Sequence, residues 1–337
     1  MVTPLPRPNQ YNASSQFIPH TAYNRCLDLE DQHKQVSQHV RLDVLVCARF
    51  LGYMILEAPT DEGRMDVASE IVRCAKTGDI GLQDLAESYK NHFFRVFYSS
   101  GCRTPAPTHP SFYNKEEYVY SLSATAASHA KSKQLALERD DFSCVLTGKT
   151  DTPSIENDLV KIPQSVVPTV TRASHILNWS ASEGLTDDNR NYAAAADAVL
   201  NRFGGIDVIK EFDGSNLHRL ENILSLSSDA CTWFSDSRIW LERDSQGLPN
   251  TYRPSSTKPS VYLAEIPNII SFSTPDPERL PLPDPRYLAV HVACARVAHM
   301  SGAAEYIHKV LRDMEETDVL RNDGPSDALY HALVRLL

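Results

Sequence analysis

The sequence has no uninterrupted apolar run that approaches the ~20 residues needed to cross a bilayer. Its first residues, MVTPLPRPNQYNASSQF, also lack the charged segment and following apolar stretch that are typical of a secretory signal. We therefore expect a protein that is neither secreted nor bound to a membrane. Its length and its 42% content of hydrophobic residues are typical of a globular chain with room for one large core or two smaller ones.

The seven cysteines follow no recognisable pattern. Their number is odd, their spacing is irregular, and no two of them form a CxxC pair. This excludes a disulfide framework and a zinc ribbon as the basis of the fold. The cysteine content predicts a reduced, intracellular setting, either cytoplasmic or nuclear.

Basic residues are outnumbered, since 33 lysines and arginines stand against 43 aspartates and glutamates for a formal net charge of −10. Contacts from lysine and arginine to phosphate supply most non-specific affinity for nucleic acid. The charge balance therefore excludes a general coating affinity for DNA or RNA. A small local basic groove stays compatible with it, so nucleic acid remains a candidate partner despite the unfavourable net charge.

Apolar periodicity divides the chain into three regions. Residues 1–135 are predicted to be mainly helical, because apolar residues recur at helical spacing in three segments, at 42–58, 66–77 and 84–100. Residues 136–262 mix strands and helices, with a predicted strand and turn in 140–149, predicted strands in 167–177, 220–227 and 238–242, and predicted helices at 188–203 and from 228 onward. Residues 263–337 form an extension with strand-like VYLAEI at its boundary, then IISFS and two helices.

Three stretches of the middle region share an order that is found in a known family. They are DFSCVLTG, then ASHIL, then LENILSLSSDACTWF. This order resembles the HNH endonuclease family with the ββα-metal fold, and in particular its fungal members, in which a Thr-Gly turn precedes a strand that carries a histidine. The resemblance implies an α+β fold, with an HNH-like ββα-metal core flanked by helical N-terminal and C-terminal regions.

The resemblance also implies roles for individual residues. His175 matches the strand histidine that acts as general base, Asn222 matches the central asparagine, and Cys231 stands where the family has its second histidine. Ser174 replaces a metal-binding aspartate of many relatives, and Phe234 matches the aromatic residue that follows.

An HNH endonuclease hydrolyses phosphodiester bonds in DNA or RNA with the help of one divalent ion. The corresponding metal would be Mg²⁺, Mn²⁺ or Zn²⁺, and its candidate ligands are Asn222, Cys231 and His218, which stands just before the second strand. Serine and cysteine at metal-facing positions weaken the binding of a hard cation, because Mg²⁺ prefers carboxylate and water oxygens whereas a thiolate favours softer ions.

Two alternatives to metal-dependent hydrolysis stay open. Cys231, His175 and Asn222 have the composition of a thiol nucleophile, its base and the residue that orients the base, which would suit acyl transfer or another biosynthetic reaction on a small molecule. The region could instead be an inactive HNH scaffold that binds protein or nucleic acid. Cys231 follows the polar segment Ser227–Asp229 at the start of a predicted helix, where a thiol pKa is lowered, but a buried and inert thiol also fits this position.

Overall fold

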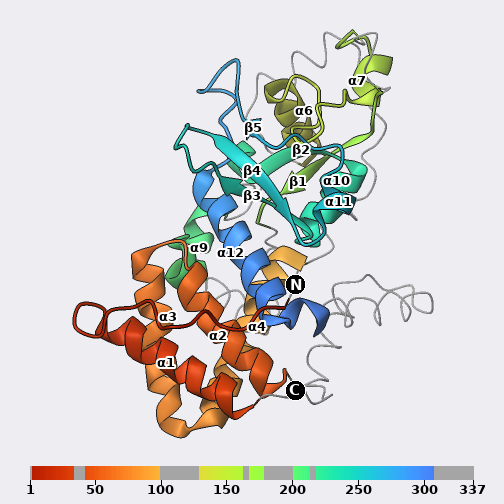
Figure 1. Cartoon of the computed structure of the whole chain (residues 1–337). Coiled ribbons are helices and arrows are strands. Elements are labelled where there is room, and N and C mark those ends of the chain that lie inside the picture. The colour runs from red at the N-terminus through yellow and green to blue at the C-terminus, as the bar shows by residue number, and fades with distance from the viewer. Residues whose placement is uncertain are drawn as a thin grey trace, which may run out of the picture. The chain divides into compact units, whose positions relative to one another are not determined.

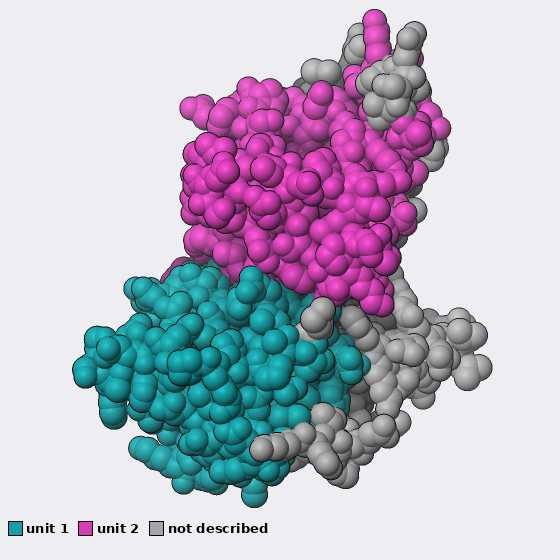
Figure 2. Space-filling view, viewed as in Figure 1, with its two compact units in different colours: residues 1–96, 185–207, 293–337 teal, residues 97–184, 208–292 magenta. Residues whose placement is uncertain are grey.

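Figure 1 shows the computed structural model of the chain, which describes residues 2–33, 42–98, 129–161, 167–177, 200–212 and 218–306. The chain forms two compact units (Figure 2). Unit 1 consists of Met1–Val96, Leu185–Asp207 and Ala293–Leu337, and unit 2 consists of Phe97–Gly184 and Val208–Val292. Each unit is thus assembled from separate stretches of sequence, whereas the regions predicted above, 1–135, 136–262 and 263–337, are consecutive.

Helices make up most of the described part of unit 1. They are α1 (Phe17–Gln32), α2 (Val44–Glu57), α3 (Asp61–Cys74), the short turn η1 (Ala75–Thr77) and α4 (Asp79–Tyr98), of which the last two residues belong to unit 2. α2, α3 and α4 lie where helical spacing predicts them. Side-chain oxygens begin two of these helices, because Asp43 accepts a hydrogen bond from the Leu45 amide and Thr60 accepts one from the Gly63 amide.

α1 packs against both α2 and α3 around a buried apolar core. The largest fully buried side chains there are Tyr23, Leu29, Phe50, Leu51, Tyr53, Met54 and Ile55. Most of them come from α2, which is buried on nearly every side and is therefore the central helix of the unit. α1 is not among the helices predicted from the sequence. It follows a stretch rich in proline, asparagine and serine.

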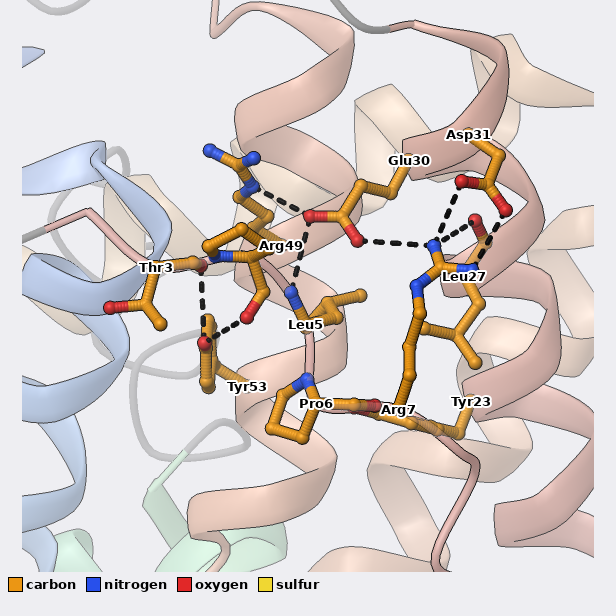
Figure 3. A network of polar contacts seen from close by, with 11 residues as sticks. Thr3, Leu5, Pro6, Arg7, Tyr23, Leu27, Glu30, Asp31, Arg49 and Tyr53 are labelled. Carbon is orange, nitrogen blue, oxygen red and sulfur yellow. Dashed lines mark hydrogen bonds and ion pairs between the residues drawn. The ribbon is translucent and has the colours of Figure 1, made fainter.

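An extended N-terminal segment, Thr3–Arg7, lies along α1 and α2 (Figure 3). The hydroxyl of Tyr53 is within hydrogen-bond distance of two of its carbonyl oxygens, at 2.8 and 3.1 Å, and the hydroxyl of Tyr23 donates to a third at 2.9 Å. Leu5 is buried against Gly52, where any Cβ atom would meet the leucine side chain. The segment is therefore part of the packed structure of unit 1.

Charged groups hold the same segment from the α1 side. The buried carboxylate of Glu30 accepts hydrogen bonds from the Leu5 amide at 3.2 Å and from the Arg49 Nε at 2.7 Å. Arg7 reaches Glu30 at 3.4 Å and forms a two-pronged pair with Asp31 at 2.9 and 3.0 Å (Figure 3). Glu30 therefore has both backbone and side-chain partners, as a buried carboxylate requires.

Unit 2 combines short strands with short helices. In chain order its elements are α6 (His129–Arg139), α7 (Thr152–Glu156), β1 (Thr171–His175), α9 (Val208–Glu211), η4 (Leu220–Asn222), β2 (Ile223–Ser227), α10 (Ser228–Ser235), β3 (Ile239–Arg243), β4 (Thr251–Ser256), α11 (Pro259–Tyr262) and β5 (Ile270–Ser271). α12 (Pro285–Ser301) contributes its first half to unit 2 and its second half to unit 1. The mixture of helices and small antiparallel sheets agrees with the α+β class predicted from the sequence.

Two antiparallel sheets lie in unit 2. β1 pairs with β2 in a register that sets Ala173 opposite Ser225 and His175 opposite Ile223, and β4 lies between β3 and β5 in the second sheet. α10 follows β2 without a gap and contacts both β1 and β2. These three elements form a strand, strand and helix arrangement in the order that the sequence motifs predict.

Local predictions failed at three places. Residues 140–149 contain the predicted turn, at which Gly148, with φ +67°, donates to the Cys144 carbonyl, but not the predicted strand. VYLAEI overlaps α11, which begins at Pro259, a favourable first residue of a helix. β4 was not predicted, since its internal Pro254 argues against a strand. The helix predicted at 188–203 and the last helix of the chain lie mostly outside the described residues.

Candidate functional site

The predicted site residues lie around the junction of β1 and β2. His175 is the last residue of β1, and Asn222 immediately precedes β2. The two strands are antiparallel, so the end of β1 lies beside the start of β2. Beneath this junction is a buried apolar cluster formed by Leu135, Ala136, Ala173, Leu220, Ile223 and Leu280. The cluster joins α6 to both strands and therefore holds the end of β1 against the start of β2.

Asn222 fixes the chain just after His175. Its side-chain amide binds the backbone of Leu177 at both ends, because Oδ1 accepts from the Leu177 N–H at 2.9 Å and Nδ2 donates to the Leu177 carbonyl at 2.9 Å. The Asn222 carbonyl also accepts a hydrogen bond from Ile176 at 2.8 Å. Asn222 is fully buried, so these bonds are not exposed to competition from solvent.

This geometry sets the Asn222 amide against the backbone two residues beyond His175. Orientation of the base is one of the two roles expected for Asn222 from the sequence. The other expected role, a metal ligand, requires the amide oxygen to face a hydrated ion, whereas this oxygen points to a backbone N–H inside the protein. The amide oxygen of Asn222 therefore faces the backbone of Leu177 in this structure.

His175 and His218 lie together although 43 residues separate them. The Nε2 atom of His175 is 3.1 Å from the Nδ1 atom of His218, and the ring centroids are 5.2 Å apart with the planes inclined by 47°. Both side chains are half-buried. One ring must donate the shared proton and the other accept it, so the two imidazoles form a coupled pair.

Cys231 lies in the second turn of α10, after Ser227, whose hydroxyl accepts a hydrogen bond from the Ala230 amide. Cys231 is fully buried, and its sulfur is disulfide-bonded. A disulfide sulfur carries no thiolate, so in this state Cys231 can neither attack a substrate nor bind a metal ion as a thiolate. The irregular spacing of the cysteines contained no signal of this cross-link, and a disulfide disagrees with the reduced setting expected from that spacing. Cys26, Cys47, Cys74, Cys144 and Cys294 are free thiols.

By the resemblance described above, Ser174 is expected to occupy the place of a metal-binding aspartate. Its hydroxyl is buried and has no hydrogen-bond partner among the residues described. It precedes His175 on β1 and faces the opposite side of the strand from Ala173. A neutral hydroxyl at this place supplies no negative charge for a cation.

The divalent ion that the family implies does not fit the residues present. Across the described ranges, no three His, Cys, Asp or Glu side chains come close enough together to hold a metal ion. Neither Ser174 nor the disulfide-bonded Cys231 supplies the charged oxygen ligand that a hard cation prefers, and the Asn222 amide binds the backbone. Of the three predicted ligands, only His218 presents its ring to another candidate residue, which is His175.

A buried ion pair that was not predicted from the sequence supports the site. Arg139, at the end of α6, pairs with Asp140 and donates to the carbonyl oxygens of Leu220 at 2.8 Å and Ile223 at 2.7 Å. These two carbonyls flank Asn222 on either side, so Arg139 fixes the segment that contains it. The signal available in the sequence was an adjacent Arg-Asp pair immediately after a helical segment, a position at which a solvated pair is the usual expectation.

His291, a buried histidine of α12, packs against α10. The ring of His291 stacks on Phe234 with centroids 3.9 Å apart and planes inclined by 6°, and its Nε2 lies 3.2 Å from the Phe234 carbonyl. Complete burial lowers the pKa of His291 to about 4, because the charged form would lose its hydration. His291 is therefore neutral at neutral pH and serves as a packing residue for the helix that carries Cys231.

Comparison with known proteins supports the resemblance over one part of the chain. The model of the HNH endonuclease family matches residues 144–242, a segment that covers less than half of the sequence and includes β1, β2 and α10. No curated protein and no solved structure matches the chain. Among the described residues, no helix is long and apolar enough to cross a membrane.

Proposed function

We propose that unit 2 carries an HNH-type phosphodiesterase site of low activity, which hydrolyses DNA or RNA with His175 as its general base. The observation that carries this proposal is the position of His175 at the end of β1, where both ends of the Asn222 amide hold the following backbone. This arrangement lies within the segment that matches the HNH endonuclease family.

In the proposed reaction, His175 takes a proton from a water molecule as its oxygen attacks phosphorus. A phosphorus–oxygen bond forms to the water, the ester bond on the opposite side breaks, and the leaving oxygen takes a proton from solvent. His218 stabilises the imidazolium that forms on His175, because a neutral ring 3.1 Å away can accept a hydrogen bond from it. Asn222 acts through Leu177 and touches neither the water nor the phosphate.

The absence of a suitable hard-cation site among the described residues is the reason for the low activity proposed. In the family, a divalent ion stabilises the charge that develops on the phosphate and on the leaving oxygen. With Ser174 and a disulfide-bonded Cys231 at the positions in question, this contribution is weak, and no step above depends on it. Acyl transfer at Cys231 gains no support from the structure, because it requires a free thiolate.

The base is tested by cleavage of supercoiled plasmid DNA and of single-stranded RNA in Mg²⁺, Mn²⁺ and Zn²⁺. His175→Ala should lower the rate by about 10²–10⁴-fold, the usual contribution of a positioned general base. His33→Ala, which alters a half-exposed histidine in unit 1, should leave the rate unchanged. Equal rates in the wild type and the His175→Ala variant would refute the assignment, provided that circular dichroism shows both proteins folded.

The cation position is tested by two variants of Cys231. Cys231→His restores the residue that the family has in its helix, and we expect cleavage in Mg²⁺ or Mn²⁺ to rise. Cys231→Ala is the matched control, because it removes the disulfide without adding a ligand. A gain in both variants would attribute the effect to loss of the disulfide. A failure of the wild type and both variants to cleave any substrate would leave an HNH scaffold that binds without hydrolysis.

A further inference from the structure

We infer that His175 and His218 form a two-nitrogen chelate for a late first-row transition-metal ion of the Zn²⁺ class. This site differs from the hard-cation position of the HNH family, because its ligands are the strand histidine itself and a histidine from the segment before η4. Binding of such an ion would occupy the imidazole that the proposed hydrolysis needs. Only this consequence for activity rests on the proposed function, whereas the binding site rests on the geometry of the two rings.

The spacing of the two nitrogens fits one shared ion. They are 3.1 Å apart, and bonds of about 2.0–2.1 Å from each nitrogen to one ion would enclose an angle of about 95–100°. This value lies between the octahedral and tetrahedral angles. The rings are already inclined to each other by 47°, so a modest rotation of each side chain directs both lone pairs to a common point.

The backbone around both histidines is held by the same residue. Asn222 binds the chain at Ile176 and Leu177, immediately after His175. Its own backbone amide donates to the Arg219 carbonyl at 3.0 Å, which fixes the turn immediately after His218. An ion would therefore meet two ligands whose backbones are already positioned, and it would cost less to order them than to order two mobile side chains.

The chemistry of the pair selects the class of ion. Imidazole nitrogen suits Zn²⁺, Co²⁺, Ni²⁺ and Cu²⁺, whereas Mg²⁺ and Ca²⁺ prefer oxygen ligands. The nearest cationic neighbour in the sequence, Arg219, is paired with Glu221 at 2.8 Å, so its charge is largely compensated. The proposed chelate has two protein ligands, so we expect water to complete the coordination and the site to be weak and rapidly exchanging.

Co²⁺ titration of the full-length protein, followed by d–d absorption and by isothermal titration calorimetry with Zn²⁺, tests the site directly. The titrations are done in a Cys74→Ser background, because Cys74 is the one free thiol of the described residues that is not buried. His218→Ala should weaken binding by at least the about 10–100-fold that loss of a supporting partner costs a metal site. His33→Ala is the control and should bind as the parent does.

Unchanged affinity in the His218→Ala variant would overturn the inference. His175→Ala provides a second and independent loss of one ligand, and the two single variants should weaken binding to a similar degree. Because these titrations contain no nucleic acid, binding without any cleavage would refute the proposed function and keep the metal site. If His175→Ala abolishes cleavage but neither histidine affects metal binding, the metal site would be refuted and the proposed function would stand.

The consequence for activity has a separate readout. If the protein cleaves DNA or RNA in Mn²⁺, added Zn²⁺ should inhibit the wild type at the concentrations at which it binds in calorimetry. His218→Ala should need at least about tenfold more Zn²⁺ for the same inhibition, in proportion to its weaker binding. Inhibition at the same Zn²⁺ concentration in both proteins would show that the ion acts elsewhere.

Discussion

The N-terminal segment of unit 1 and the end of β1 in unit 2 are both held by a buried polar side chain, but with different chemistry. Glu30 holds the segment at Leu5 with a carboxylate whose other partners are Arg7 and Arg49. Asn222 holds Leu177 with a neutral amide that binds the backbone N–H and carbonyl of that residue. Glu30 thus fixes the N-terminal segment with a charged group, whereas Asn222 fixes the backbone after His175 with a neutral one.

The difference teaches where charge is tolerated beside a reactive group. A carboxylate at the position of Asn222 would place a buried negative charge next to the imidazole pair and would need a cation of its own. Asn222 satisfies one donor and one acceptor of the same residue without adding charge. The charged support of unit 2 is instead Arg139 with Asp140, which acts on the carbonyls on either side of Asn222.

The largest loss is expected from Arg139→Ala. This change leaves the buried carboxylate of Asp140 without its cationic partner and removes hydrogen bonds from the Leu220 and Ile223 carbonyls, so the free energy of unfolding of unit 2 should fall by about 3–5 kcal/mol. Arg279→Ala is the control, because it breaks an exposed pair with Glu138 and should cost at most about 1 kcal/mol. Urea unfolding measures both, and equal losses would show that Arg139 has no special role.

Asn222→Ala should follow, with a loss of about 2–4 kcal/mol. It leaves the buried N–H and carbonyl of Leu177 without partners, and each such group costs about 1–3 kcal/mol. Asn157→Ala removes a single half-buried hydrogen bond to the Pro153 carbonyl and should cost about 1 kcal/mol or less. The Asn222→Ala variant also tests the site, because Zn²⁺ affinity should fall although Asn222 binds no ion; unaltered affinity would remove its positioning role.

His291 should make the stability of unit 2 depend on pH. Its pKa in the folded protein is about 4 and its ordinary value is 6.5, so only the unfolded chain takes up a proton between these values. The free energy of unfolding is therefore unaffected by His291 above pH 6.5. It falls by about 3 kcal/mol in total as the pH drops from 6.5 to 4, because protonation then favours the unfolded chain. His291→Phe keeps an aromatic ring on Phe234 and should show a shallower decline over this range than the wild type. Identical slopes, measured by urea unfolding at each pH, would contradict the expectation.

The smallest of these effects is expected at Glu30, the buried carboxylate of unit 1. Glu30→Gln keeps the shape of the side chain but removes its charge, and we expect a loss of about 1–2 kcal/mol, because Arg7 is partly exposed and its share is screened. Asp31→Asn, at an exposed carboxylate, should cost a few tenths of a kcal/mol. Limited proteolysis should release the N-terminal segment faster in the Glu30→Gln variant than in the Asp31→Asn variant. Equal release rates in the two variants would show that Glu30 does not hold the segment as Asn222 holds the end of β1.

Helical spacing in the sequence predicted α2, α3 and α4, and the order of the motifs predicted β1, β2, α10 and β3. Both signals are local, since a buried face repeats at the period of its own element. The same reasoning predicted the turn at Gly148 correctly but failed on the strand expected from the alternating pattern in residues 140–149. It also failed at α1, whose apolar face is recognisable only beside the helices that cover it.

The sequence by itself determined the order of the Thr-Gly turn, His175, Asn222 and Cys231, and this order resembles that of the HNH endonuclease family. Only the tertiary structure decided what these residues touch. The contact of His175 with His218, the bonds of Asn222 to Leu177 and the support from Arg139 join residues 43, 45 and 81 positions apart. Local propensity carries no information about such pairings, because they depend on how distant elements pack around a shared core.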